Sequence, residues 1–202
     1  MLNRLGRAAI TRVLTPVARL LNALGISPDV VTIVGTLGVC FGALAFFPQN
    51  RLLVGTLVIV AFVFSDTVDG IMARMRGRSS TWGAYLDSTL DRVGDAAIFG
   101  GLVLLYARQA DLLMAGLALA CLILGGVVSY AKARAEGLGM TANVGIAERA
   151  DRLVAVLLAT GLVGLGLPTA VLGVILGLLA IASAVTVVQR MLEVRRQALT
   201  SA

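Results

Sequence analysis

The sequence contains no histidine, only two cysteines and few charged residues. Without histidine, zinc enzymes built on imidazole ligands and triads that need a histidine base are excluded. Cys40 and Cys121 stand inside apolar runs, where they fit as small packing residues and indicate neither a disulfide nor a metal site. Charged residues make up 14% of the 202 residues, against about 25% in soluble domains. Apolar residues, in contrast, make up 58% of the chain, and this composition predicts an integral membrane protein.

Six apolar runs are long enough, or nearly so, for the roughly 20 residues that a spanning helix needs. They lie at about 30–47, 52–73, 91–107, 112–131, 152–167 and 169–188. The sequence therefore predicts an all-α membrane protein with six transmembrane helices, forming one domain over residues 25–202.

Residues 1–24 precede these runs and have a different pattern. Apolar residues recur there at spacings of three and four, with four arginines between them. This pattern is typical of an amphipathic helix that lies on the membrane surface, with its cations near anionic head groups. We expect a juxtamembrane interfacial helix over 1–24.

Basic residues are distributed unequally between the two sides of the predicted bundle. Only Arg51 and Arg108 lie on one side, and the other 15 of the 17 lysines and arginines lie on the opposite side. By the positive-inside rule that side is cytoplasmic. The protein is then expected in the cell membrane, with both termini and the acidic residues on the cytoplasmic side. The net charge of +6 is then mostly a matter of topology, and no nucleic acid partner is expected.

Four carboxylates adjoin the second and third apolar runs. Asp66 and Asp69 are three residues apart and Asp87 and Asp91 are four apart, so each pair shares one helix face. If the two helices fold back as a hairpin, both faces meet at the cytoplasmic boundary. Four carboxylates in one pocket repel each other unless cations bind them. Oxygen ligands alone select hard ions, so two Mg²⁺ or Mn²⁺ ions are expected.

Neighbouring residues suit a phosphate ligand. Gly70 leaves bare backbone beside Asp69, and Arg74 can hold phosphate oxygens in a bidentate contact. Ser27 and Pro28 predict a helix start whose free N–H groups face the same layer. The alternative is that the acids only pair with nearby arginines at the interface.

The segment from Asp66 to Asp91 reads D-x-x-D-G-x-x-A-R-x8-G-x-x-x-D-x-x-x-D without a gap. Its fixed positions are Asp66, Asp69, Gly70, Ala73, Arg74, Gly83, Asp87 and Asp91. This motif closely resembles that of the CDP-alcohol phosphotransferases. The resemblance covers the whole chain, although "SPDVVT" stands where many relatives have "TPN".

The resemblance implies the reaction and its residues. A CDP-linked lipid gives its phosphatidyl group to an acceptor hydroxyl, and CMP leaves. Asp66, Asp69 and Asp87 would bind one metal ion, and Asp91 would help to hold the second and act as general base. The CDP portion would contact Asp29, Val30, Val31, Thr32, Gly70, Arg74 and Ser80.

The family also implies a homodimer. The pairs Gly38/Gly42 and Gly173/Gly177 could serve the contact between subunits or packing within one subunit.

Two other classes of membrane protein use similar acids. A membrane prenyltransferase combines aspartates, Mg²⁺ and a diphosphate, but its first motif begins with asparagine and its bundle is larger. A cation transporter would carry its acids near the middle of the bilayer, whereas here they lie at one surface.

Residues outside this motif indicate which alcohol is the acceptor. Four cations at the cytoplasmic helix ends suit a phosphate monoester: Lys132, Arg134, Arg152 and Arg195. Arg149 is left out of this set, because Glu148 and Asp151 are available to pair with it. The segments "LDSTLDRVGD" and "SYAKARAEGLG" look most like actinobacterial family members that make phosphatidylinositol phosphate. The expected substrates are CDP-diacylglycerol and inositol 1-phosphate, with glycerol 3-phosphate as the alternative acceptor.

Overall fold

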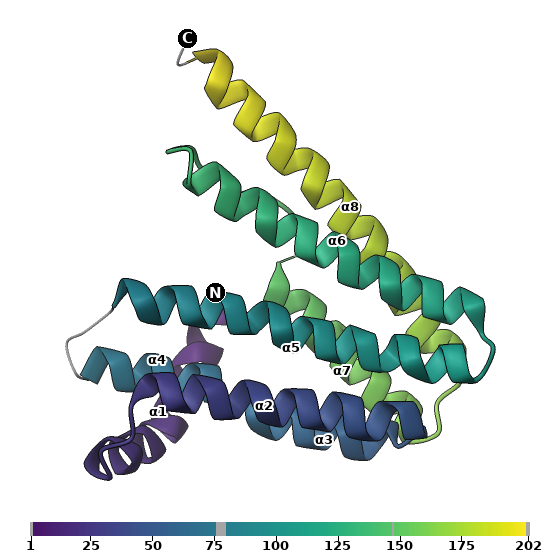
Figure 1. The fold of residues 1–202 in the computed structure, drawn as a ribbon, viewed down its shortest axis with the longest axis horizontal. Helices are drawn as coiled ribbons and strands as arrows, with labels where there is room; N and C mark the ends of the chain where they lie inside the picture. The colour runs from purple at the N-terminus through teal and green to yellow at the C-terminus, as the bar shows by residue number, and fades with distance from the viewer. Residues whose placement is uncertain (1, 76–79, 147, 201–202) are drawn as a thin grey trace.

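A computed structural model of the chain describes residues 2–75, 80–146 and 148–200, and within these ranges the side chains of 2–12 and Asp66 are left undescribed. Over these ranges the chain forms helices and turns without a strand, so the predicted all-α class is confirmed there (Figure 1). The helices are α1 (Leu2–Ala23), α2 (Pro28–Phe46), the short 3₁₀ helix η1 (Phe47–Gln49), α3 (Leu52–Val63), α4 (Ser65–Met75), α5 (Thr81–Arg108), α6 (Leu112–Glu136), α7 (Arg149–Gly164) and α8 (Thr169–Thr200).

Four stretches of the described chain are long and apolar enough to cross a membrane: 28–49, 52–75, 112–136 and 169–200. The other two predicted spans fall on α5 and α7. α5 begins at Thr81, before the predicted apolar run, and carries several charged residues in its first half. α7 has 16 residues. The count of six spans therefore stays a prediction.

The predicted second run is not one continuous helix. Phe64 divides it into α3 and α4. The chain passes very close to α2 at this point: a Cβ atom added to Gly35 would lie 1.7 Å from the Ser65 hydroxyl, and one added to Gly38 would lie 2.3 Å from the Phe62 ring. Glycines on α2 therefore allow the close approach, and the Gly38/Gly42 pair is used for packing within one subunit.

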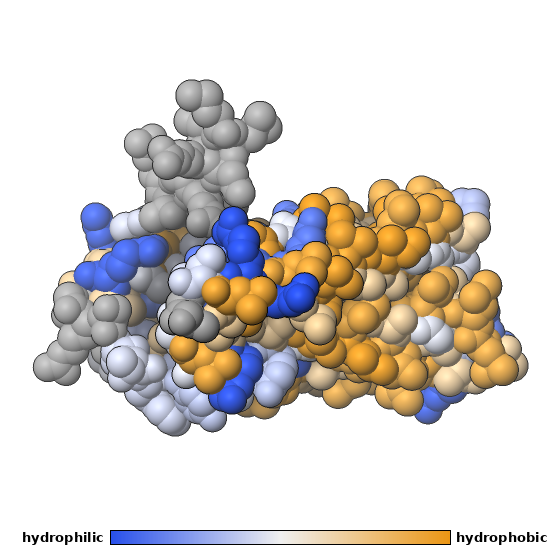
Figure 2. Space-filling view, turned by 90° about the horizontal axis from the view of Figure 1, so that it is seen from above, coloured by the Kyte–Doolittle hydropathy of each residue, from blue (hydrophilic) through white to orange (hydrophobic). Residues whose placement is uncertain are grey.

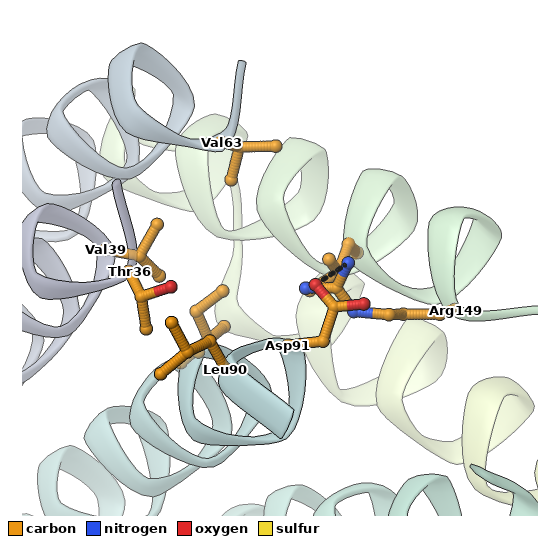
Figure 3. A pocket seen from close by; sticks show the side chains of 9 residues that line it. Thr36, Val39, Val63, Leu90, Asp91 and Arg149 are labelled. Carbon is orange, nitrogen blue, oxygen red and sulfur yellow. Dashed lines mark ion pairs between the residues drawn. The ribbon is translucent and has the colours of Figure 1, made fainter. Parts of the chain in front are cut away.

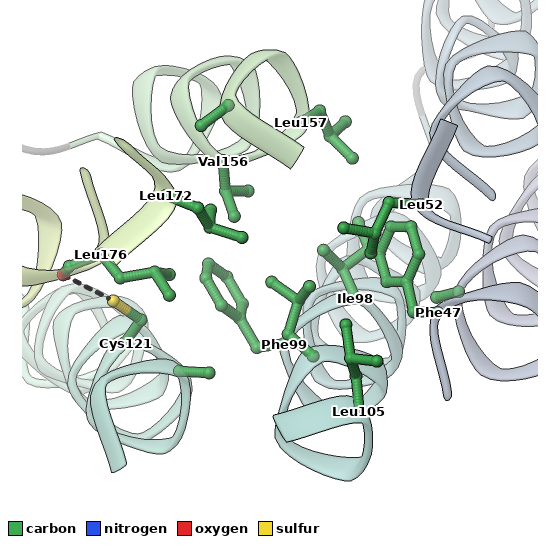
Figure 4. Packing of buried hydrophobic residues seen from close by; sticks show 14 of the residues in the cluster. Phe47, Leu52, Ile98, Phe99, Leu105, Cys121, Val156, Leu157, Leu172 and Leu176 are labelled. Carbon is green, nitrogen blue, oxygen red and sulfur yellow. Dashed lines mark hydrogen bonds between the residues drawn. The ribbon is translucent and has the colours of Figure 1, made fainter. Parts of the chain in front are cut away.

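The buried core joins η1 and helices α2, α3 and α5–α8. Figure 4 shows Phe99 and Ile98 of α5 between Phe47 and Leu52 on one side and Leu172 on the other. The Cys121 thiol donates to the Leu176 carbonyl oxygen at 3.2 Å. Cys40 and Cys121 are both free thiols in the structure.

Two adjacent glycines on α5 have opposite surroundings. A Cβ atom on Gly101 would lie 2.8 Å from the Ala43 carbonyl oxygen of α2, whereas one on Gly100 would meet nothing within 4 Å. Because backbone atoms yield little, we expect Gly101→Ala to destabilise the protein by about 1–3 kcal/mol. Gly100→Ala is the matched control and should be neutral or stabilising. Thermal unfolding in detergent measures both, and equal melting temperatures would contradict the packing described here.

Polar and apolar surfaces are segregated along the bundle. In the view of Figure 2, hydrophobic residues cover one half and hydrophilic residues gather toward the other end. That end holds the start of α5 and the end of α4 (Figure 1). The predicted acidic helix faces are therefore at a polar end of the bundle.

The segment between α6 and α7 runs along α8 in the opposite direction. The Thr141 N–H donates to Gln197 Oε1 at 2.9 Å, Arg190 Nε donates to the Val144 carbonyl oxygen at 3.0 Å, and the Ile146 N–H donates to Thr186 Oγ1 at 3.2 Å. Three successive contacts thus fix this loop against one helix.

Candidate active site

The start of α2 forms one wall of the candidate site. Ser27 caps the helix, its hydroxyl oxygen accepting from the Val30 N–H at 3.3 Å, and Pro28 occupies the first turn, as predicted. One turn later the Thr32 hydroxyl donates to Asp69 Oδ2 at 2.5 Å, which joins α2 to α4. The expected phosphate-binding helix start and the second motif carboxylate are therefore adjacent.

Asp69 has surroundings that suit a cation ligand. Its side chain is buried, and the Thr32 hydroxyl orients one carboxylate oxygen. A Cβ atom on the next residue, Gly70, would point into open space, so a ligand can approach the backbone there. The predicted partner Asp66 has its side chain outside the described residues. Among the side chains that are described, no three acids lie together as a metal site.

Asp91 lies in a small cleft between helices α2, α3, α5 and α7. The cleft is lined by Thr36, Val39, Val63, Leu90, Asp91, Gly94, Ile98, Arg149 and Leu153. Figure 3 shows the Arg149 guanidinium of α7 pointing at the Asp91 carboxylate, and Nη1 lies 2.7 Å from Oδ1. Arg92 Nη2 approaches the other carboxylate oxygen at 3.5 Å.

Arg149 also contacts Asp95, an acid 54 residues away in sequence. Its Nε lies 3.1 Å from Asp95 Oδ1. Glu148 and Asp151 are its neighbours in sequence, but the Arg149 side chain, at the first residue of α7, reaches two carboxylates of α5. Asp95 itself is buried and was missed, although it continues the four-residue spacing from Asp87 and Asp91.

The remaining motif residues lie at the start of α5 and the end of α4. The Ser80 hydroxyl oxygen accepts from the Gly83 N–H at 2.9 Å and so caps α5. Trp82 Nε1 donates to Asp29 Oδ2 at 3.1 Å, which links the starts of α5 and α2. Asp87 and Arg74 are exposed. Two helix N-termini thus lie together, an arrangement that favours anions.

The four cations expected around the acceptor have different surroundings. Arg152 is 2% exposed and lies 3.8 Å from Asp95. Lys132 lies 3.9 Å from Glu136 on its own helix, and Arg134 and Arg195 are exposed.

The inward-facing cation of α8 is Arg190, which sequence reasoning missed. Its side chain is buried, and Nη1 and Nε donate to the carbonyl oxygens of Val128 and Val144 at 2.5 and 3.0 Å. A lone arginine after a long apolar run was the available signal. Its position ties α6, α8 and the loop between α6 and α7 together.

Comparison with known proteins identifies one group of relatives. Residues 25–188 match the family model described as CDP-alcohol phosphatidyltransferase. The chain is 52% identical to the phosphatidylinositol phosphate synthase of Streptomyces avermitilis, over 98% of this chain and 84% of the relative. It is 46% identical to that of Cutibacterium acnes, over 94% of this chain and 96% of the relative.

Solved structures match the fold as well. The crystal structure of the Mycobacterium tuberculosis phosphatidylinositol phosphate synthase with CDP-DAG bound has a TM-score of 0.86 at 42% identity, covering 91% of this chain and 94% of that one. The structure of the same protein in complex with manganese and citrate has a TM-score of 0.83 at 41% identity, covering 90% of this chain and 88% of that one. The helical arrangement around the acidic motif is therefore shared with these relatives.

Proposed function

Because the chain belongs to the CDP-alcohol phosphatidyltransferase family, we propose that it transfers the phosphatidyl group of CDP-diacylglycerol to inositol 1-phosphate, giving phosphatidylinositol phosphate and CMP. The main observation that supports this proposal is the intact motif from Asp66 to Asp91 in a chain that is 52% identical to a phosphatidylinositol phosphate synthase. Family membership removes the prenyltransferase and transporter alternatives.

In the proposed mechanism Asp91 acts as general base. The acceptor enters the cleft between α2, α3, α5 and α7, and Asp91 takes the proton of its hydroxyl as that oxygen attacks the phosphatidyl phosphorus. The bond from phosphorus to CMP breaks. The helix start at Asp29–Thr32, with Gly70, Arg74 and Ser80, binds the CDP portion.

Divalent cations complete this site. The buried Asp69 carboxylate, the open space at Gly70 and an all-oxygen donor set fit Mg²⁺ or Mn²⁺. Asp66, Asp69, Asp87 and Asp91 would hold two ions. When bound, the ions neutralise the diphosphate and stabilise CMP as it leaves. The manganese in a relative's structure supports this assignment.

The acceptor is tested by offering each alcohol in turn to the purified protein with CDP-diacylglycerol. We expect product from inositol 1-phosphate and little from glycerol 3-phosphate or inositol, because a dianionic phosphate suits the cations Lys132, Arg134, Arg152 and Arg195. Arg134→Ala should raise the apparent KM for inositol 1-phosphate by about tenfold, as expected when a contact to a charged group is lost. Use of glycerol 3-phosphate alone would overturn the acceptor assignment and leave the transferase chemistry standing.

The proposed topology follows from charge and helix length. We place six spans in the cell membrane, with α5 and α7 as the two that are least apolar, and both termini in the cytoplasm. Residues 1–24 form an interfacial helix and residues 25–202 the catalytic domain. Supporting this, the N-terminal segment forms helix α1.

We further propose a homodimer in which each subunit has its own site. Gly173 packs against Met114 within the subunit, whereas a Cβ atom on Gly177 would meet nothing within 4 Å, so the surface of α8 near Gly177 is open to a second copy. Native mass analysis in mild detergent should give active dimers. Full activity in a preparation that contains monomers alone would contradict this proposal.

A further inference from the structure

We propose that Arg149 couples the binding of the acceptor's phosphate to the binding of a divalent cation at Asp91. In this inference Arg149 contacts Asp91 in the resting enzyme and moves to the phosphate when the acceptor arrives. The proposal rests on the proposed function and adds a positioning role for Arg149 and Asp95.

Both oxygens of the Asp91 carboxylate have a guanidinium beside them. Arg149 Nη1 lies 2.7 Å from Oδ1, and Arg92 Nη2 lies 3.5 Å from Oδ2 (Figure 3 shows the Arg149 contact). A divalent cation that approaches Asp91 therefore meets positive charge and competes with Arg149 for the same oxygen. While Arg149 stays on Asp91, the affinity of that carboxylate for the cation is lowered.

Asp95 gives Arg149 a second anchor. The Nε atom of Arg149 lies 3.1 Å from Asp95 Oδ1, and Asp95 is buried. Arg149 can release Asp91 through its terminal nitrogen while Nε keeps its contact. The Arg149 side chain is 27% exposed and lines the cleft, so an anion in the cleft can reach it.

Charge balance gives the direction of the coupling. Among the side chains that the structure describes, the guanidiniums of Arg92, Arg149 and Arg152 lie around the carboxylates of Asp91 and Asp95. A divalent cation added alone is repelled by these guanidiniums. A phosphate dianion added alone draws guanidiniums from the carboxylates. Bound together, each ligand offsets the charge that opposes the other, and such coupling is reciprocal by thermodynamic linkage.

The coupling is measured without CDP-diacylglycerol, so that no turnover occurs. Mn²⁺ binding to the full-length protein in detergent is followed by electron paramagnetic resonance, with and without inositol 1-phosphate. We expect inositol 1-phosphate to tighten Mn²⁺ binding by about tenfold in the wild type, within the usual range of coupling between two sites. Inositol without the phosphate should have no effect.

The variant Arg149→Met removes the guanidinium and keeps an apolar side chain. It should bind Mn²⁺ more tightly than the wild type when no acceptor is present, and inositol 1-phosphate should no longer change that affinity. Arg149→Lys is the second variant, because one ammonium cannot contact both carboxylates in the way a guanidinium does, and it should lose most of the coupling.

Arg196→Met is the matched control. Arg196 is exposed and pairs with Glu193 at 2.8 Å, away from the cleft. This variant should show the wild-type coupling, so that a loss of coupling in the Arg149 variants cannot be a general effect of removing a guanidinium.

The outcomes separate this inference from the proposed function. No coupling in the wild type, or full coupling in both Arg149→Met and Arg149→Lys, overturns the role of Arg149. If the same wild-type preparation makes phosphatidylinositol phosphate, the proposed function stands regardless. If it makes none from any acceptor tested, the proposed function fails.

Discussion

Asp91→Asn is expected to lower the transfer rate by about a hundredfold or more, because a general base contributes roughly 10²–10⁴ to a rate. Asparagine has nearly the same shape as aspartate but cannot take the proton of the acceptor hydroxyl. The fold should survive, since Arg149 keeps its contact with Asp95 at 3.1 Å. Release of CMP from CDP-diacylglycerol in the presence of inositol 1-phosphate measures the rate.

Asp111→Asn is the matched control for this substitution. Asp111 lies at the start of α6, where its carboxylate accepts from the Met114 N–H at 3.0 Å, and asparagine can form the same cap. The control should be fully active. CDP-diacylglycerol should still bind to Asp91→Asn, and near-normal turnover in that variant would refute the role of Asp91 as base.

Removal of divalent cations is expected to abolish transfer, and Mg²⁺ or Mn²⁺ should restore it. The hydroxyl that orients Asp69 allows a finer test. Thr32→Val removes the donor that lies 2.5 Å from Asp69 Oδ2. Loss of such a supporting hydrogen bond typically weakens metal binding by about 10–100-fold. Titration with Mn²⁺, read both as binding and as restored activity, measures the change.

Thr56→Val serves as the control for Thr32→Val. Thr56 is buried on α3, and its hydroxyl makes no hydrogen bond to the described part of the chain. Mn²⁺ affinity in this variant should equal that of the wild type. Transfer that continues after complete removal of divalent cations would contradict the metal assignment altogether.

Features governed by local rules could be predicted from the sequence. Ser27 and Pro28 specify the start of α2 through capping, and the structure places both there. The motif from Asp66 to Asp91 identified the family, because its fixed positions all lie within one short segment of the sequence.

Features that depend on packing between distant segments could not be predicted. Next to the division at Phe64, Ser65 lies against Gly35 of α2, a contact that hydropathy does not record. Arg149 has acids beside it in sequence, yet it contacts Asp95, 54 residues away. In the same way, Arg190 turns inward because carbonyl oxygens of Val128 and Val144 lie within its reach.

The loop that lies along α8 has a consequence for protein engineering. Hydrophilic loops are the usual places to insert an epitope tag or a fiducial domain for electron microscopy. Here residues 141–146 are held by Gln197, Arg190 and Thr186, and a Cβ atom on Gly145, whose φ is 141°, would lie 2.3 Å from the Thr186 methyl group. An insertion there would pull the loop from α8. The turn between α5 and α6 at Ala110, exposed and on the opposite side of the bundle, is the better point for a fusion.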